Sequence, residues 1–397
     1  MTQYPTNDTV PPDKFGFDSP HDRRGSNCYK WDSTESETIP MWVADMDFQA
    51  SPAIREALRK RMEHGIFGYT RVPQAYYDSI IHWFGRRHGW HIEREWLLYT
   101  TGVVPAASAV LKALTQPGDG VILQTPAYNC FFSSIRNNGC RIAENPLMNR
   151  NGRFEIDYDH LEQLCQDAVN RVLLFCNPHN PTGRLWTKEE LQRVAEICDR
   201  YGIQVISDEI HCELTYEGNR YVPFGTISGA AIILSSPSKS FNTAGLQIAN
   251  IVCRDTALRR RINRAININE VCDVNPFGPL ALMAAYDESE EWLNELCKYI
   301  WQNYKTLCEF VAAELPQMKI TPLEATYLVW ADCSAWKADS DTLAEILEQQ
   351  AGVKLSSGML YGQAGEGFLR INIACPRGRM LEGLRRMAHC MRKLDCL

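Results

Sequence analysis

The 397-residue sequence lacks the features that mark membrane, secreted and nucleic-acid-binding proteins. No stretch approaches the ~18 uninterrupted apolar residues that a membrane-spanning helix needs. The N-terminal segment, 1–13, is polar and carries prolines, unlike a signal peptide. The formal net charge is -7 and no cluster of lysine and arginine stands out. We therefore expect neither a membrane nor a nucleic acid as a partner.

The sequence also lacks paired cysteines. It contains fifteen cysteines, but none of them form a Cys-x-x-Cys motif. Many lie inside apolar runs, as Cys176 does in Leu-Leu-Phe-Cys. This distribution is typical of reduced core residues and not of a disulfide framework or a zinc site. It predicts a cytoplasmic protein without a metal centre.

The composition is that of an ordinary globular protein, with 45% hydrophobic and 22% charged residues. The length is sufficient for a large core and two domains. In the middle of the chain, short apolar runs alternate with helical patterns such as 106–114 and 188–200. The apolar runs predict strands at 96–100, 120–124, 171–176, 204–208, 231–235 and 247–253.

Apolar strands separated by helices predict a parallel sheet that is covered on both faces. After about residue 289 the pattern changes to a long amphipathic run, two short strands at 326–332 and 368–373, and a terminal helix from Arg377. We therefore expect a large α/β domain at 51–289 and a smaller α+β domain at 290–397. An N-terminal arm, 1–50, is expected to pack with the smaller domain.

Lys239 lies in the run Ser-Pro-Ser-Lys-Ser-Phe-Asn, 236–242, just after an expected strand. A lysine in this setting fits a site that forms a Schiff base with an aldehyde cofactor, because burial lowers the pKa of an amine. A Ser-x-x-Lys match also arises by chance in many proteins. The run therefore needs support from the rest of the chain.

Further motifs fall at the ends of expected strands, where sites form in parallel sheets. Asn180 lies in Asn-Pro-His-Asn-Pro-Thr-Gly, which is either a tight turn or a turn that presents an amide to a ligand. Asp208 ends an apolar strand, as a helix cap or as a buried carboxylate that needs a partner. The amides of Val103 and Val104 open a helix and favour an anion such as phosphate. Tyr128 is either a core ring or a stacking platform.

Together these motifs resemble the pyridoxal-phosphate enzymes of the aspartate aminotransferase fold, in order and spacing over nearly the whole chain. The resemblance implies fold type I, an α/β architecture in which a mostly parallel seven-stranded sheet lies between helices beside a smaller α+β domain. Further segments resemble the narrower branch of C-S lyases that includes cystathionine β-lyase and cystalysin. They are Met-Trp-Val-Ala-Asp-Met-Asp-Phe at 41–48, Phe-Gly-Tyr-Thr at 67–70 and Asp-Glu-Ile-His at 208–211.

The resemblance assigns a role to each candidate around the cofactor ring. Lys239 is expected to hold pyridoxal phosphate as a Schiff base and to shuttle the Cα proton. Asp208 is expected to pair with the pyridine nitrogen, Asn180 to bond the phenolic oxygen and face the substrate, and Tyr128 to stack on the ring. Arg370 is expected to clamp the α-carboxylate of an amino-acid substrate, because its planar fork suits a bidentate pair.

The resemblance also predicts how the phosphate is held. The amides of Val103 and Val104, with Ser236 and Ser238, are expected to bind it. Tyr69 is expected to reach the phosphate and substrate of the neighbouring subunit, which requires a homodimer with active sites at the subunit interface.

Two positions depart from the pattern of many aminotransferases. Gln247 stands where an arginine often neutralises the phosphate, eight residues after the lysine. His211 replaces the usual tyrosine, as a further group at the cofactor or as a structural histidine. Trp42 and Tyr327 are candidate walls of the substrate pocket.

The expected activity is a pyridoxal-phosphate carbon–sulfur β-lyase that cleaves cystathionine, cysteine or a related S-substituted L-cysteine to pyruvate, ammonia and a thiol. Such an activity belongs to amino-acid metabolism, for example methionine biosynthesis. An aminotransferase on the same scaffold is the alternative, because both reactions begin by removing the Cα proton. A cofactor-binding protein that works through protein contacts is a third hypothesis. The set of Lys239, Asp208, Asn180 and Arg370 argues against it, because a binding module needs no proton shuttle.

Overall fold

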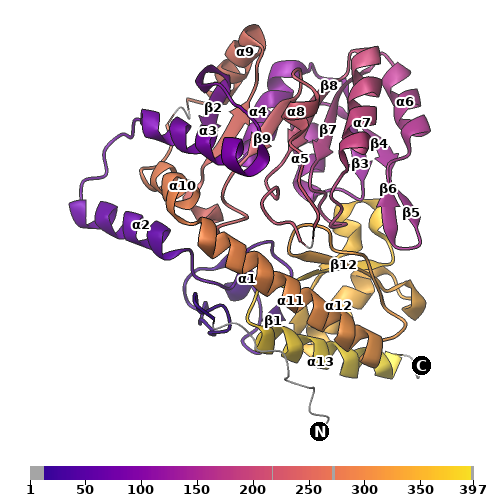
Figure 1. The fold of residues 1–397 in the computed structure, drawn as a ribbon. Coiled ribbons are helices and arrows are strands. Elements are labelled where there is room, and N and C mark those ends of the chain that lie inside the picture. The colour runs from indigo at the N-terminus through magenta and orange to yellow at the C-terminus, as the bar shows by residue number, and fades with distance from the viewer. Residues whose placement is uncertain (1–12, 217, 271–272, 395–397) are drawn as a thin grey trace.

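The structure, a computed structural model, describes residues 13–216, 218–270 and 273–394. The chain folds around two sheets, one in the upper and one in the lower part of Figure 1. The upper sheet has seven strands. They are β2 (Leu97–Thr100), β3 (Gly120–Thr125), β4 (Arg141–Pro146), β7 (Asn170–Cys176), β8 (Gln204–Asp208), β9 (Ile232–Ser235) and β10 (Ala249–Val252).

The order of strands in the large sheet is β2-β10-β9-β8-β7-β3-β4. Strand β10 runs antiparallel to both of its neighbours, whereas the other adjacent strands pair in parallel. The expected α/β fold with a mostly parallel seven-stranded sheet is therefore confirmed.

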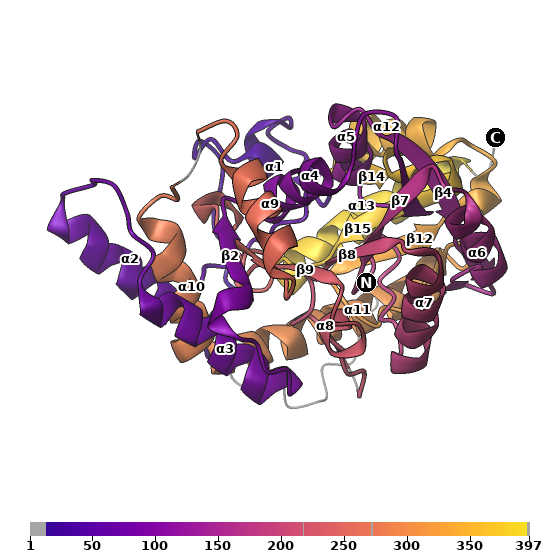
Figure 2. The ribbon, with the colours of Figure 1, turned by 90° about the horizontal axis from the view of Figure 1, so that it is seen from above.

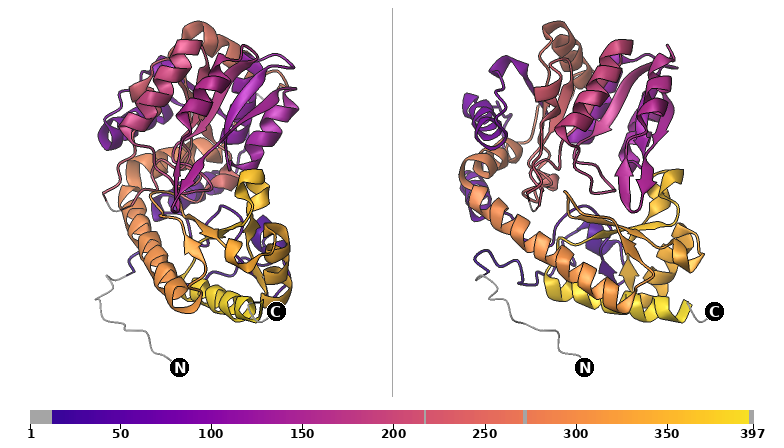
Figure 3. Two further views of the ribbon diagram at one scale, coloured as in Figure 1. Left: turned by 90° about the vertical axis from the view of Figure 1, so that its right-hand side faces the viewer. Right: turned by 45° about the vertical axis from the view of Figure 1, so that its right-hand side comes forward.

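Successive residues of the strands pack against opposite layers of helices, because side chains alternate between the faces of a sheet. In β7, Leu173 joins one buried core cluster, and Val172 and Leu174 join the other. The figures show helices on both sides of the sheet (Figures 2 and 3). One layer contains α4 (Val103–Leu114), α5 (Asn129–Asn137) and α9 (Thr256–Ile266). The other contains α3 (Gln74–His88), α6 (Tyr158–Gln166), α7 (Lys188–Tyr201), α8 (Phe224–Ile227) and α10 (Phe277–Glu288).

The smaller sheet has four strands in the order β11-β12-β15-β14. They are β11 (Lys319–Ile320), β12 (Leu328–Asp332), β14 (Ser356–Ser357) and β15 (Phe368–Asn372). Three helices accompany it, namely α11 (Glu290–Glu314), α12 (Ser340–Ala351) and α13 (Arg377–Leu394). In Figure 1, α11 crosses the molecule below the large sheet.

The N-terminal segment runs beside the smaller sheet. Helix α1 (Tyr29–Asp32) precedes strand β1 (Ile39–Pro40), which pairs in parallel with β13 (Val353–Lys354). Helix α2 (Pro52–His64) then projects to one side of the molecule in Figures 1 and 2. No helix in the described ranges is long and apolar enough to cross a membrane.

Two differences from the expected strands have physical reasons. Strand β4 was not predicted, because it lies at the edge of the sheet and is polar and partly exposed. A short hairpin follows it, formed by β5 (Met148–Arg150) and β6 (Arg153–Glu155). Strand β10 begins at Ala249, two residues later than expected, because Gln247 closes a 3-10 turn with a φ of 54°.

Candidate active site

The candidate residues meet at the carboxyl ends of three neighbouring strands. Cys176 of β7 lies opposite Asp208 of β8, which lies opposite Leu234 of β9. The turn that carries Asn180, the carboxylate of Asp208 and the loop of Lys239 therefore emerge side by side. This is the edge at which parallel sheets place their ligand sites.

The amine of Lys239 faces inward from the loop after β9. Its Nζ donates a hydrogen bond of 2.6 Å to the carbonyl of Ala44. Burial and, after it, the positive charge of Arg370 lower the pKa of Lys239 to about 8, against the opposing charges of Asp45 and Asp208. The lowered pKa increases the fraction of this amine that is neutral near neutral pH, as a nucleophile and proton acceptor requires.

The carboxylate of Asp208 is buried, and few neighbouring groups stabilise its negative charge. Burial raises the pKa of Asp208 to about 7, and the Ile210 amide and the charge of Lys239 offset this only in part. That amide donates to Oδ1 of Asp208 over 3.0 Å. Among the described residues no side chain donates a hydrogen bond to this carboxylate. A cationic ring nitrogen of a ligand would supply the missing partner.

Arg370 lies in β15 of the smaller sheet and points across to the large one. Its Nη1 donates to Oδ1 of Asn180 over 3.1 Å, and its Nη2 donates to the carbonyl of Trp42 over 2.7 Å. Within the described chain, its buried Nε has no hydrogen-bond partner. The guanidinium carbon lies 4.8 Å from the ring centroid of Tyr361. The structure thus brings Arg370 and Asn180 together and leaves the Nε of Arg370 available to donate to a substrate carboxylate.

Three rings border the same space. His211 is buried, and its Nδ1 has no hydrogen-bond partner in the part of the chain described. Burial, with the charges of Lys239 and Arg370, holds the pKa of His211 far below its usual value, so the imidazole is neutral. It meets Tyr327 edge to face with ring centroids 6.0 Å apart. Tyr128 lies between the carboxyl end of β3 and the start of α5, and burial raises the pKa of its hydroxyl.

The expected phosphate donors lie along the same edge of the sheet. Val103 and Val104 begin α4, and the preceding Gly102 provides no side-chain cap for their amides. Ser236 donates to the carbonyl of Ile248 over 2.6 Å and accepts from the Ser238 amide over 3.1 Å. The uncapped amides at a helix N-terminus favour an anion.

Two residues are not brought to the site within this chain. Tyr69 lies between α2 and α3 with its side chain fully exposed. Gln247 is also exposed, at the end of the turn after Lys239.

Two asparagines that the sequence did not single out hold the segment 41–48 against the site. Asn372 donates to the carbonyls of Val43 and Asp45, each over 2.6 Å. Asn242 donates to the carbonyls of Met46 and Phe48 over 3.0 and 2.8 Å. Both asparagines end the motifs that contain Lys239 and Arg370, which was the available signal.

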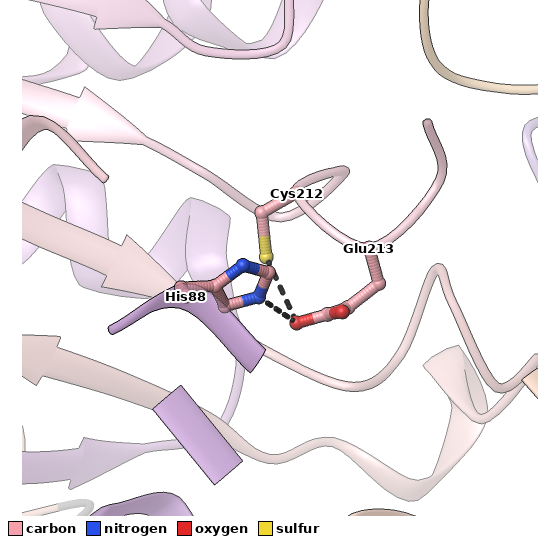
Figure 4. Close-up of side chains that lie close together, drawn as sticks. All are labelled: His88, Cys212 and Glu213. Carbon is pink, nitrogen blue, oxygen red and sulfur yellow. Dashed lines mark hydrogen bonds and ion pairs between the residues drawn. The ribbon is translucent and has the colours of Figure 1, made fainter. Parts of the chain in front are cut away.

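A second group of polar side chains lies between α3 and the segment after β8. The ligand atoms of His88, Cys212 and Glu213 lie within 4.8 Å of one another (Figure 4). The carboxylate of Glu213, however, already accepts from Trp83 over 2.6 Å, from Arg87 over 2.9 Å and from His88 over 2.7 Å. These donors hold the pKa of Glu213 down to about 2 despite its burial. We interpret the group as a set of ion pairs that links α3 to the segment after β8. A metal cation would have to compete with Arg87 for the carboxylate of Glu213.

The model of the family described as aminotransferase class I and II matches residues 37–387. The chain belongs to this family. The resemblance expected from the motifs is thereby confirmed.

Relatives of this chain include lyases of the expected branch. Cystathionine beta-lyase PatB of Bacillus subtilis is 38% identical over 94% of this chain and 99% of its own length. The crystal structure of cystalysin from Treponema denticola, which contains a pyridoxal 5'-phosphate cofactor, superposes with a TM-score of 0.93 at 34% identity, over 95% of this chain and 99% of that one. A PLP-bound putative aminotransferase from Clostridium difficile superposes with a TM-score of 0.92 at 35% identity, over 95% of this chain and 100% of that one.

Proposed function

We propose that this protein is a pyridoxal-phosphate-dependent carbon–sulfur β-lyase. Its substrates are cystathionine, cysteine or related S-substituted L-cysteines. The observation that carries the proposal is the meeting of Lys239, Asp208 and Arg370 at one edge of the sheet, in a chain similar over its length to a cystathionine beta-lyase.

The residues of the site fit this cofactor. Among the described residues no cation forms an ion pair with the buried carboxylate of Asp208, whose burial the charge of Lys239 offsets only in part, and a protonated pyridine nitrogen would supply that partner. The first amides of α4 are uncapped, as a phosphate would require. In the described chain, Arg370 retains an unpartnered Nε for a carboxylate. Asn180 would bond the phenolic oxygen, Tyr128 would face the ring, and Ser236 and Ser238 would complete the phosphate site, with His211 as a neutral neighbour.

When bound, the cofactor withdraws electrons from the substrate Cα and so acidifies its proton. Arg370 holds the α-carboxylate and fixes the orientation of the Cα–H bond. Lys239 accepts the Cα proton, for which an amine with a pKa of about 8 is suited. With a thiolate leaving group on Cβ, the electron pair of the broken Cα–H bond forms the Cα–Cβ double bond and the C–S bond breaks. Hydrolysis of the resulting enamine then yields pyruvate and ammonia.

The aminotransferase alternative shares the first proton transfer. It would differ in the next step, in which Lys239 would pass the proton to the bound cofactor and no thiolate would leave. The similarity of this chain to a putative aminotransferase is the reason to test this alternative.

The two reactions are separated by incubating the purified enzyme with L-cystathionine in the absence of any keto acid. We expect continuous formation of pyruvate and a free thiol. An aminotransferase instead stops after one turnover per site and resumes when 2-oxoglutarate or pyruvate is added. That behaviour, without thiol release, would refute the lyase proposal.

The proposal extends to assembly and location. A homodimer in the cytoplasm, with a role in amino-acid metabolism such as methionine biosynthesis, is the arrangement we propose. The dimer is supported by the exposure of Met62, Ile66, Phe67 and Tyr69 on and after the projecting helix α2. We also propose the domain division at 51–289 and 290–397, with the arm 1–50 packed on the smaller domain.

A mixture of inactive subunits tests the dimer. Lys239→Ala and Tyr69→Ala chains are unfolded and refolded together. If Tyr69 serves the neighbouring site, each hybrid regains one complete site and lyase activity returns. A mixture as inactive as its components would contradict an interface role for Tyr69.

A further inference from the structure

Tyr327 lies beside the amine of Lys239 but has no part in the chemistry described above. Its ring is fully buried, and its hydroxyl donates to the carbonyl of Ala44 over 2.9 Å. The amine of Lys239 donates to the same carbonyl oxygen over 2.6 Å. A phenol of the smaller part of the molecule and the lysine of the large sheet therefore share one main-chain acceptor.

The main-chain carbonyls next to that of Ala44 are bound by other side chains. The carbonyls of Val43 and Asp45 on either side are bound by the amide of Asn372. The carbonyl of Trp42 is bound by Arg370. These contacts fix the run of the main chain and leave the oxygen of Ala44 facing Lys239 and Tyr327.

We propose that Tyr327 is a positioning residue for proton transfer by Lys239. Its hydroxyl anchors the Ala44 carbonyl, and this carbonyl holds the lysine amine in the direction from which it reaches the substrate Cα. The inference rests on the proposed function only in that the amine is taken to act as the proton shuttle.

The chemistry of the contact supports this role. A hydrogen bond from a protonated amine to a carbonyl stabilises the charged form of the amine and is stronger than a neutral one. Burial and the charge of Arg370 both lower the pKa of Lys239, so an acceptor held in place keeps the amine able to retain a proton. Burial also raises the pKa of Tyr327, so its hydroxyl remains a donor over the whole working range.

The test compares Tyr327→Phe with Tyr216→Phe. Tyr216 is a matched control because its buried hydroxyl also donates to a carbonyl, that of Thr326, over 2.6 Å. The first readout is the pKa of Lys239 in the full-length cofactor-free protein. It is obtained by competitive labelling with a small acylating reagent across pH and mass spectrometry of the Lys239 peptide.

We expect Tyr327→Phe to lower the pKa of Lys239 by about one unit, the scale of a partly lost hydrogen bond to a charged group. Tyr216→Phe should leave this pKa unchanged. The second readout uses the holoenzyme with L-cystathionine. There kcat should fall about tenfold, less than the roughly 10²–10⁴-fold expected when the acid–base group itself is lost, with KM unchanged and a larger α-deuterium isotope effect.

An unchanged or raised pKa of Lys239 in folded Tyr327→Phe would overturn the inference, and so would equal effects of the two variants. The labelling needs neither cofactor nor turnover, so its outcome stands even if the lyase proposal fails. Conversely, a lowered pKa together with transamination in place of lyase turnover would reject the lyase and keep the positioning role.

Discussion

Two buried carboxylates five positions apart, Asp208 and Glu213, have opposite surroundings. Both are buried, yet the pKa of Asp208 is raised to about 7 and that of Glu213 is lowered to about 2. Among the described residues, Asp208 accepts one hydrogen bond, from a main-chain amide, whereas Glu213 accepts hydrogen bonds from Trp83, Arg87 and His88 of α3. Figure 4 shows the contact with His88. A buried carboxylate that lacks a partner is suited to binding a cationic ligand, and one that has its partners is suited to holding elements together.

The largest expected effect concerns the lysine beside Asp208. Lys239→Ala should lower the rate of pyruvate formation from L-cystathionine by about 10²–10⁴-fold, because the proton acceptor is lost. Its thermal unfolding should stay close to wild type, since Nζ makes a single hydrogen bond among the described residues. Borohydride reduction of the wild type, followed by peptide mapping, should place the cofactor on Lys239. A reduced adduct on another lysine would reject the assignment.

A substitution of Glu213 tests whether this carboxylate stabilises the fold. Glu213→Gln should lower the free energy of unfolding by about 3 kcal/mol, because Arg87 and His88 lose a buried charged partner. Denaturant titration measures this loss. Turnover at a temperature where the variant is folded should remain near wild type. A large loss of turnover with unchanged stability would place Glu213 in the active site and would contradict the structural role assigned to it in contrast to Asp208.

The ligand-binding side is tested at Asp208. Asp208→Asn should weaken binding of pyridoxal phosphate by about tenfold or more, the scale of one hydrogen bond to a charged group. Fluorescence titration of the cofactor-free protein measures this affinity, and circular dichroism should show an intact fold. Turnover should fall as well. Normal affinity and turnover would show that Asp208 is a helix cap and that the cofactor binds elsewhere.

The last prediction concerns the pH dependence of stability in the cofactor-free protein. The folded pKa of Asp208 lies above its unfolded value of 3.8, so its contribution is lost as pH rises from about 4 to 7. The folded pKa of Glu213 lies below its unfolded value of 4.5, so its contribution is lost as pH falls from about 4.5 to 2. Asp208→Asn should therefore remove a decline in the free energy of unfolding as pH rises towards 7. Glu213→Gln should remove a decline in the free energy of unfolding as pH falls below about 4.5. Identical profiles for the two variants would contradict the assigned pKa shifts.

The sequence by itself determined most strands of the large sheet and most of the set of residues at its edge. Long apolar runs such as that of β7 have few alternatives to buried strands, and neighbouring parallel strands bring their carboxyl ends together. Asn180, Asp208 and Lys239 could therefore be grouped before any contact was known. Strand β4 could not be found in this way, because a polar edge strand carries little hydrophobic signal.

Only the tertiary structure decided what each of these groups contacts. Asp208 and Glu213 both lie within Asp-Glu-Ile-His-Cys-Glu, and nothing in that run separates them. They differ because α3, more than a hundred residues earlier in the chain, brings its donors to Glu213. The shared acceptor of Lys239 and Tyr327 likewise joins segments near residues 44, 239 and 327. Local sequence sets which residue stands at a strand end, but the charge that a buried group can carry depends on partners that only folding assembles.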